Sequence, residues 1–139
     1  MLERHKSRKV SSTFKRKVQG ASPHRQLRPI SEAHLHKQVS DFLAIALVSG
    51  WHTTFPADGS SRRGRIGLKR GVPDILIIEA GHAFWLELKT PRGRLSEAQA
   101  LAHTALRLAG SGVATCQTLE EVMIALNVWG VSLRPGVRL

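Results

Sequence analysis

The stretch that most constrains the fold of this chain is GVPDILIIEAGHAFWLELK, which runs from Gly71 to Lys89. A short apolar run at 75–78 is followed by a glycine-containing turn at 79–82. An aromatic and apolar run at 83–89 comes next and becomes charged at its end. Short runs that are rich in β-branched and aromatic residues are typical of strands rather than helices. The stretch therefore predicts a β-hairpin.

Three charged side chains are expected to meet at the open end of this hairpin. Side chains alternate across a strand, so Glu87 and Lys89 share one face. Antiparallel pairing brings the start of the first strand beside the end of the second, which puts Asp74 next to Glu87. Two adjacent carboxylates repel each other unless a cation lies between them, and such oxygen-rich sites suit Mg²⁺ or Mn²⁺. The pattern thus indicates metal-assisted phosphodiester hydrolysis, in which the lysine positions water or offsets charge on the phosphate.

The same residues resemble the signature of a nuclease superfamily. Pro-Asp at 73–74, twelve intervening residues and Glu-Leu-Lys at 87–89 resemble the PD-(D/E)-x-K pattern. The surrounding GLKRGVPDILI at 67–77 and FWLELKTPRGRLSEAQ at 84–99, with Glu32 upstream, are similar to its virus-type replication-repair branch, the VRR-NUC family. This resemblance to a stand-alone phage or bacterial type of member covers most of the chain.

The resemblance implies both a fold and a set of site residues. The fold would be α/β, a single domain with a mixed central β-sheet flanked by helices, in the restriction-endonuclease-like order αβββαβ. The order of patterns along the chain agrees with it. In a Mg²⁺- or Mn²⁺-dependent DNA endonuclease of this kind, Asp74 and Glu87 would ligate the metal and the Leu88 carbonyl would add a ligand. Lys89 would act in catalysis, and Glu32 would bind the metal directly or through water.

Two side chains on the predicted helices have a structural explanation beside the functional one. Ser31 is a candidate N-cap. Glu32 lies in the first turn, where its negative charge stabilises the helix through the helix dipole, and this alone would explain the residue. His36 lies one turn later and faces either the site or solvent. Gln99 fits a capping box with Ser96, but the resemblance places a catalytic glutamine there, near the lysine, to orient water or phosphate.

The remaining patterns predict packing rather than chemistry. The first helix carries an apolar stripe of Leu35, Val39, Phe42, Leu43, Ala46 and Leu47, and Gly50 is expected to end it. The helix after Ser96 is expected to pack through Leu101, Ala102, Ala105, Leu108 and Ala109. A strand at 113–116 buries the single cysteine, Cys116, and a second capping box of Thr118 and Glu121 opens a last helix.

Positive charge is concentrated in two places. Lys and Arg total 21 against 10 Asp and Glu, a net charge of +11, and residues 1–30 hold nine of the basic residues and one acid. This uneven distribution predicts a basic flexible arm at 1–29 and a nuclease domain at 30–139. A basic arm binds polyanions through counterion release. The residues expected to contact DNA are Arg62, Arg63, Arg65, Lys69, Arg70, Arg92 and Arg94.

The expected partner is DNA, and no membrane segment or apolar signal core is visible, which predicts a cytoplasmic, nucleoid-associated protein encoded by a bacterium or phage. Small stand-alone members of the family resemble homodimeric junction-resolving enzymes, and paired cuts in a four-way junction need a two-fold axis. Branched DNA such as Holliday junctions is therefore the favoured substrate, in DNA repair. The alternatives are a non-catalytic nucleic-acid-binding module, a basic RNA- or ribosome-associated protein, and a restriction-type or flap nuclease.

Overall fold

The computed structural model describes residues 30–55 and 69–137, and in them three helices and four strands follow one another in the predicted order. Within these ranges no helix has the length and apolar character needed to cross a membrane. The elements are α1 (Glu32–Ala46), β1 (Trp51–Thr54), β2 (Ile75–Glu79), β3 (His82–Leu88), α2 (Glu97–Leu108), β4 (Gly112–Cys116) and α3 (Leu119–Val128).

The four strands form one mixed sheet, as predicted, and they lie in the order β1-β2-β3-β4 within it. β2 pairs antiparallel with both β1 and β3, whereas β4 runs parallel to β3 after the crossover through α2. The β2–β3 turn is tighter than the sequence indicated, because Glu79 still pairs with His82 and only Ala80 and Gly81 turn, both with positive φ. Ile75 pairs with Leu86, so the continuing register sets the next residues, at positions 74 and 87, opposite each other.

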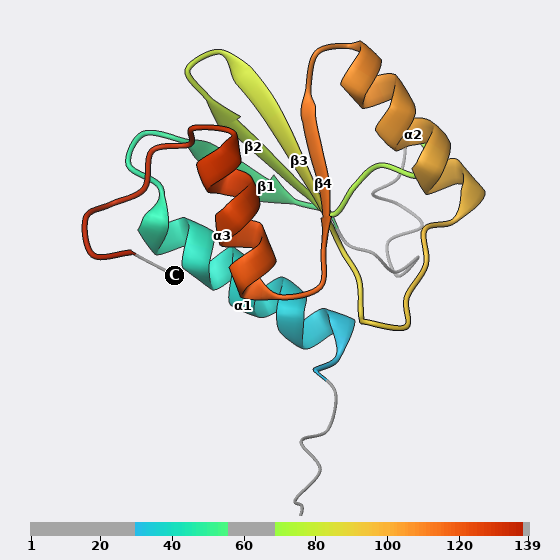
Figure 1. The fold of residues 1–139 in the computed structure, drawn as a ribbon, viewed down its shortest axis with the longest axis horizontal. Coiled ribbons are helices and arrows are strands. Elements are labelled where there is room, and N and C mark those ends of the chain that lie inside the picture. The colour runs from blue at the N-terminus through green and yellow to red at the C-terminus, as the bar shows by residue number, and fades with distance from the viewer. Residues whose placement is uncertain (1–29, 56–68, 138–139) are drawn as a thin grey trace, which may run out of the picture.

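Helices cover both faces of this sheet, with α2 on one side and α1 and α3 on the other (Figure 1). The core lies between the sheet and the α1–α3 layer, and the predicted stripe of α1 is confirmed there. Leu86 and Leu88 of β3 are fully buried in that core, which leaves Glu87 on the opposite face, toward α2. The buried core residues include Leu35, Val39, Leu43, Ile75, Ile77, Leu86, Leu88, Cys116, Val122 and Leu126.

The predicted packing face of α2 is wrong. Leu101 is 66% exposed and Leu108 is 85% exposed, whereas His103 is buried at 1%. The face that α2 turns to the sheet lies about one residue away around the helix and carries two polar side chains, Gln99 and His103. The physical reason is that this face lies over the carboxylate of Glu87, where hydrogen-bonding groups are more favourable than aliphatic ones.

The helix ends follow the predicted caps with one exception. The Ser31 hydroxyl accepts from His34 N at 3.2 Å, and the Ser96–Gln99 capping box is complete. In the last helix Thr118 accepts from Glu121 N at 3.2 Å, but the Glu121 carboxylate accepts from Gln117 N at 2.6 Å instead of closing a box.

The C-terminal tail explains why α1 stops earlier than the predicted Gly50. Leu47 has an extended backbone and forms a β-bridge with Leu133. Arg134 N donates to Ala46 O at 2.8 Å, which satisfies a carbonyl that the helix end would otherwise leave free. Trp129 stacks on Phe84, with ring centroids 5.0 Å apart, beside the edge strand β4.

Candidate active site

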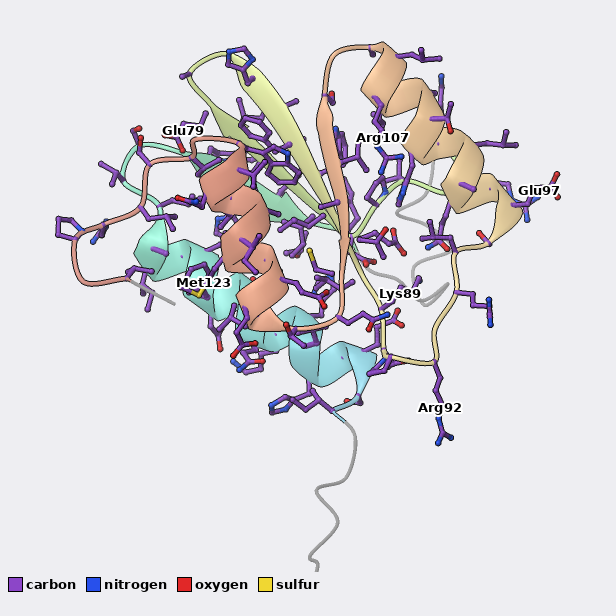
Figure 2. All side chains as sticks on the ribbon, viewed as in Figure 1. Glu79, Lys89, Arg92, Glu97, Arg107 and Met123 are labelled. Atoms are coloured by element: carbon purple, nitrogen blue, oxygen red, sulfur yellow. The ribbon has the colours of Figure 1, made fainter. Side chains whose placement is uncertain are left out.

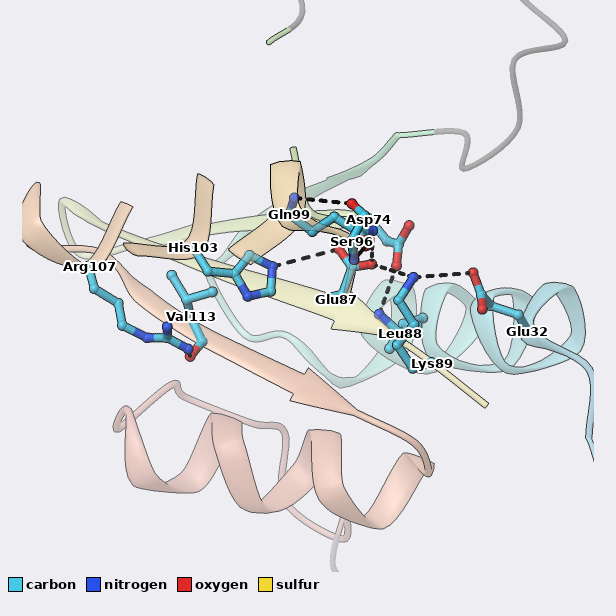
Figure 3. Close-up of polar contacts among 10 residues, drawn as sticks. All are labelled: Glu32, Asp74, Glu87, Leu88, Lys89, Ser96, Gln99, His103, Arg107 and Val113. Atoms are coloured by element: carbon cyan, nitrogen blue, oxygen red, sulfur yellow. Dashed lines mark hydrogen bonds and ion pairs between the residues drawn. The ribbon is translucent and has the colours of Figure 1, made fainter. Parts of the chain in front are cut away.

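Asp74 is fixed by the strands on both sides of it. Its side chain is 6% exposed, and its Oδ2 accepts a hydrogen bond from Leu88 N at 2.7 Å (Figure 3). Its carbonyl accepts from Phe55 N at 2.7 Å, so the backbone is tied to the end of β1. Asp74 thus precedes β2 with both its main chain and its carboxylate held in place.

The loop that enters Asp74 lies directly on the first turn of α2. Gly71 has φ +81°, and a Cβ at this position would lie 2.1 Å from the carbonyl oxygen of Ala98. Only glycine allows this approach without displacing the helix. The contact fixes the N-terminus of α2, and therefore Gln99, relative to Asp74.

Glu87 is completely buried and is surrounded by hydrogen-bond donors. Its Oε1 accepts from Lys89 Nζ at 2.8 Å and from Gln99 Nε2. Its Oε2 lies 3.8 Å from His103 Nε2 (Figure 3). Gln99 also completes the capping box, because its Oε1 accepts from Ser96 N at 2.9 Å. The capping role is confirmed, and the other end of the same amide donates to Glu87, while a catalytic role of Gln99 stays a prediction.

Lys89 and two residues of α1 complete the cluster. Glu32 Oε1 lies 3.9 Å from Lys89 Nζ, and the side chains are 36% and 12% exposed, respectively. His36 lies one turn after Glu32 on α1, and its positive charge lowers the pKa of the Asp74 carboxyl. Its Nε2 is shielded from solvent and has no hydrogen-bond partner among the described residues. The structure therefore brings Glu32 and His36 to the hairpin end.

The two carboxyl groups of the hairpin are harder to ionise than usual. Burial raises the pKa of Glu87 to about 7, and the negative charge of Asp74 adds to this, although the bond from Lys89 opposes it. Burial also raises the pKa of Asp74, against the effects of the Leu88 N–H and of positive charge on His36 and Lys89. Each carboxylate is therefore short of compensating positive charge.

Lys89 stays charged despite its partial burial. Desolvation lowers the pKa of its ammonium, but the hydrogen bond to Glu87 and the negative charges of Glu87, Glu32 and Asp74 outweigh that effect. The net pKa is raised. The site therefore presents a charged lysine beside two carboxyl groups whose pKa values are raised.

These oxygen donors fit a divalent ion such as Mg²⁺. Two adjacent buried carboxylates with raised pKa values would each be favoured by a nearby cation, and Glu87 Oε2 has no hydrogen-bond partner among the described residues. Mg²⁺ usually takes one or two carboxylates and completes its shell with water and phosphate oxygens. In the described part of the chain no group of three or more His, Cys, Asp or Glu side chains gathers around one point. An ion here would be held mainly by Asp74 and Glu87.

The basic residues expected to contact DNA are only partly within the described ranges. Arg62, Arg63 and Arg65 lie outside them, as does the arm at 1–29. Lys69 and Arg70 are exposed just before Gly71, and Arg92 and Arg94 are exposed just after Lys89. Arg92 points away from the body of the protein (Figure 2). Four cationic side chains therefore lie on the two segments that lead into and out of the hairpin.

Sequence reasoning missed one residue of the site, His103. It lies four residues after Gln99, which places both on the same helix face. Burial, together with the positive charges of Arg107 and Lys89, lowers the pKa of its imidazole. That spacing was the available signal, but the predicted Leu and Ala stripe directed attention to the wrong side of the helix.

Comparison with known proteins identifies the fold. No family model matches the sequence, and no curated protein matches it. A solved structure described as a VRR_NUC domain protein superposes with a TM-score of 0.60 at 18% identity, covering 72% of this chain and 88% of that one. The resemblance noted in the sequence is thereby confirmed at the level of the fold, which is the α/β fold of that VRR_NUC protein.

Proposed function

We propose that this protein is a Mg²⁺- or Mn²⁺-dependent endonuclease that hydrolyses phosphodiester bonds in DNA. The observation that carries the proposal is the meeting of Asp74, Glu87 and Lys89 at one end of the β2–β3 hairpin. Both carboxyl groups are buried there, and Lys89 Nζ lies 2.8 Å from Glu87 Oε1. The likeness in fold to a VRR_NUC domain protein supports the same class of activity, because the sequence signature that this chain resembles belongs to nucleases.

In this proposal Asp74 and Glu87 would hold the ion, the Leu88 carbonyl would add a ligand, and Glu32 would bind directly or through water. When bound, such an ion lowers the pKa of a water and neutralises charge on phosphate oxygens. The Leu88 N–H would keep Asp74 from rotating out of the site. Gln99 would do the same for Glu87, since its amide bonds the carboxylate from the rigid first turn of α2.

Lys89 would act on the reacting atoms rather than on the ion. Its ammonium is charged and is paired with Glu87, so it would turn from Glu87 toward the phosphate once another cation neutralises that carboxylate. From there it would orient the attacking water or stabilise the negative charge that develops on the phosphate.

Branched DNA is the substrate class that we propose, with a homodimer as the active species. The exposed Lys69, Arg70, Arg92 and Arg94 support binding of a polyanion on both sides of the hairpin end. The choice of a four-way junction rests on the family resemblance, because small stand-alone members resemble homodimeric junction-resolving enzymes. Light scattering of the free protein and of its junction complex tests the dimer, since a single copy per junction would contradict it.

The test is cleavage of a labelled four-way junction beside linear duplex, single strand and a flap, with Mg²⁺, Mn²⁺ or chelator. Lys89→Ala is the diagnostic variant, and Lys37→Ala is its matched control. Lys37 is also ion-paired with a carboxylate, Asp41 at 2.6 Å, but on the exposed face of α1.

Symmetric, metal-dependent cuts in the junction by the wild type and Lys37→Ala, lost in Lys89→Ala, are the expected result. Cutting of the flap or duplex alone would keep the chemistry and overturn the substrate. Tight junction binding with no cleavage of any substrate would favour a non-catalytic binding module instead.

A further inference from the structure

His103 lies behind the proposed metal ligands and is not used by the mechanism above. It projects from α2 toward the sheet and is 1% exposed. Neither of its ring nitrogens has a hydrogen-bond partner among the described residues. Buried polar groups are nearly always hydrogen-bonded, so an imidazole with two unpartnered nitrogens at a polar site calls for a functional explanation.

The atom that His103 faces is also without a partner. Glu87 Oε2 is buried and has no hydrogen bond within the described ranges, and His103 Nε2 lies 3.8 Å from it (Figure 3). The other oxygen of the same carboxylate takes both of its donors, from Lys89 and Gln99. A buried donor and a buried acceptor therefore face each other, and a shift of about 0.8 Å would bring them to hydrogen-bonding distance.

Two cationic side chains lie near His103 and Glu87. Arg107, one turn further along α2, donates to Val113 O at 3.1 Å, and Lys89 lies on the other side of Glu87. These cations disfavour a positive charge on the imidazole. A neutral imidazole has one N–H donor, which is sufficient for one carboxylate oxygen.

We propose that His103 is a positioning residue, whose Nε2–H donates to Glu87 Oε2 and so fixes the rotation of the carboxylate. This inference rests on the proposed function, since it assigns the role through Glu87. With Gln99 on Oε1 and His103 on Oε2, the carboxylate is held from α2 at both oxygens. Its orientation then no longer depends on Lys89, which is free to leave Glu87 for the phosphate.

A carboxylate that can rotate is a weaker metal ligand than one held in place. Hydrogen-bond partners of metal ligands are commonly worth ~10–100-fold in metal affinity. The expected consequence of removing the His103 donor is therefore a loss of Mg²⁺ affinity of about tenfold or more.

The test compares His103→Leu, which removes the donor, with His103→Gln, which retains one. His82→Leu is the matched control, because His82 is exposed at the far end of the hairpin. Mg²⁺ binding is measured by calorimetry without DNA, beside kcat and KM for junction cleavage and the melting temperature. The wild-type imidazole is observed by long-range proton–nitrogen NMR, with Glu87→Gln as the reference.

The expected results separate a positioning role from a structural one. His103→Leu should bind Mg²⁺ at least tenfold more weakly and have a lower kcat, with KM for DNA and melting temperature close to wild type. His103→Gln should recover much of the Mg²⁺ affinity, and His82→Leu should behave as wild type. The spectrum should show an Nε2-protonated ring whose N–H signal shifts in Glu87→Gln.

Wild-type Mg²⁺ affinity and kcat in a folded His103→Leu would overturn the inference. So would an imidazole protonated at Nδ1 alone, and this result does not depend on whether any variant folds. Mg²⁺ binding that depends on His103, without cleavage of any DNA, would keep the inference and contradict the nuclease proposal. Cleavage that is the same in wild type and His103→Leu would keep the nuclease proposal and contradict the inference.

Discussion

Lys89 Nζ lies 2.8 Å from Glu87 Oε1, at the end of the hairpin on which the proposed activity depends, and the glutamate of this ion pair is fully buried. The two residues are two positions apart on one strand, so they share a sheet face by the pleat alone. Glu87 nevertheless has a raised pKa, because burial outweighs the bond from Lys89. One lysine is therefore insufficient to neutralise the pair of carboxylates.

The first prediction concerns the pH dependence of metal binding. Mg²⁺ competes with a proton for Glu87, whose pKa is raised to about 7. The dissociation constant should be nearly constant above pH 8 and should rise by about tenfold per pH unit well below pH 7. Calorimetry at pH 6, 7 and 8 measures it, and equal affinity at the three values would contradict the assignment of Glu87 as a ligand.

A second prediction concerns the stability of the metal-free protein. The pKa of Glu87 is raised from 4.5 to about 7 on folding, so its protonated form stabilises the folded protein. This contribution to the free energy of unfolding is fully present below pH 4.5 and is lost as pH rises through 7. In chelator, the free energy of unfolding of Glu87→Gln should therefore exceed that of wild type by about 1–3 kcal/mol at pH 8. Near pH 5 the two proteins should differ little in stability. Urea denaturation at the two pH values measures this, and an equal difference at both would be the contrary result.

The third prediction separates the two ends of Gln99. Ser96→Ala removes the helix cap and should cost about 1 kcal/mol of unfolding free energy while leaving Mg²⁺ affinity and cleavage near wild type. Gln99→Ala should lose similar stability, and in addition Mg²⁺ affinity, because Glu87 loses a donor. Equal metal affinity in the two variants would show that the amide serves only as a cap.

The fourth prediction compares two glycines with nearly the same backbone. Gly71 and Gly81 have φ of +81° and +80°, but only at Gly71 would a Cβ meet another atom, 2.1 Å from Ala98 O. Gly81→Ala should cost about 1 kcal/mol from the backbone conformation, whereas Gly71→Ala should cost at least about 3 kcal/mol and impair metal binding. Similar melting temperatures for the two variants would contradict the close approach of the loop to α2.

The hairpin and its three charged residues could be predicted because the information is local. A period of two sets which side chains share a face, and a short turn sets which ends meet, so Asp74, Glu87 and Lys89 follow from spacing alone. The caps of α1 and α2 are equally local, since Ser31 and Ser96 act on their own helices.

The rotation of α2 could not be predicted in the same way. Apolar periodicity pointed to Leu101 and Leu108, which are exposed, because the face toward the sheet lies over a carboxylate rather than over aliphatic side chains. The simultaneous use of Gln99 as cap and as donor depends on the distance from α2 to β3, and that distance is set by the packing of Gly71 on the helix. Such relationships between distant elements are absent from any local pattern.

The last prediction concerns DNA binding through Arg92 and Arg94. Arg92 lies within the turn closed by the hydrogen bond from Gly93 N to Thr90 O at 2.8 Å, and Arg94 follows that turn. If each contacts one phosphate, replacing either with alanine should lower the slope of log affinity against log salt by about 0.9. Lys37→Ala, whose charge is already paired, should leave the slope unchanged. An unchanged slope in both arginine variants would place the DNA elsewhere.

The most direct test of the central claim is anomalous diffraction from crystals soaked in Mn²⁺, collected beside crystals in chelator. The account predicts a Mn²⁺ peak bonded to carboxylate oxygens of Asp74 and Glu87, with Lys89 Nζ moved away from Glu87 Oε1. A hairpin end that keeps its Lys89–Glu87 bond and shows no Mn²⁺, or a peak that lies only elsewhere on the protein, would contradict it.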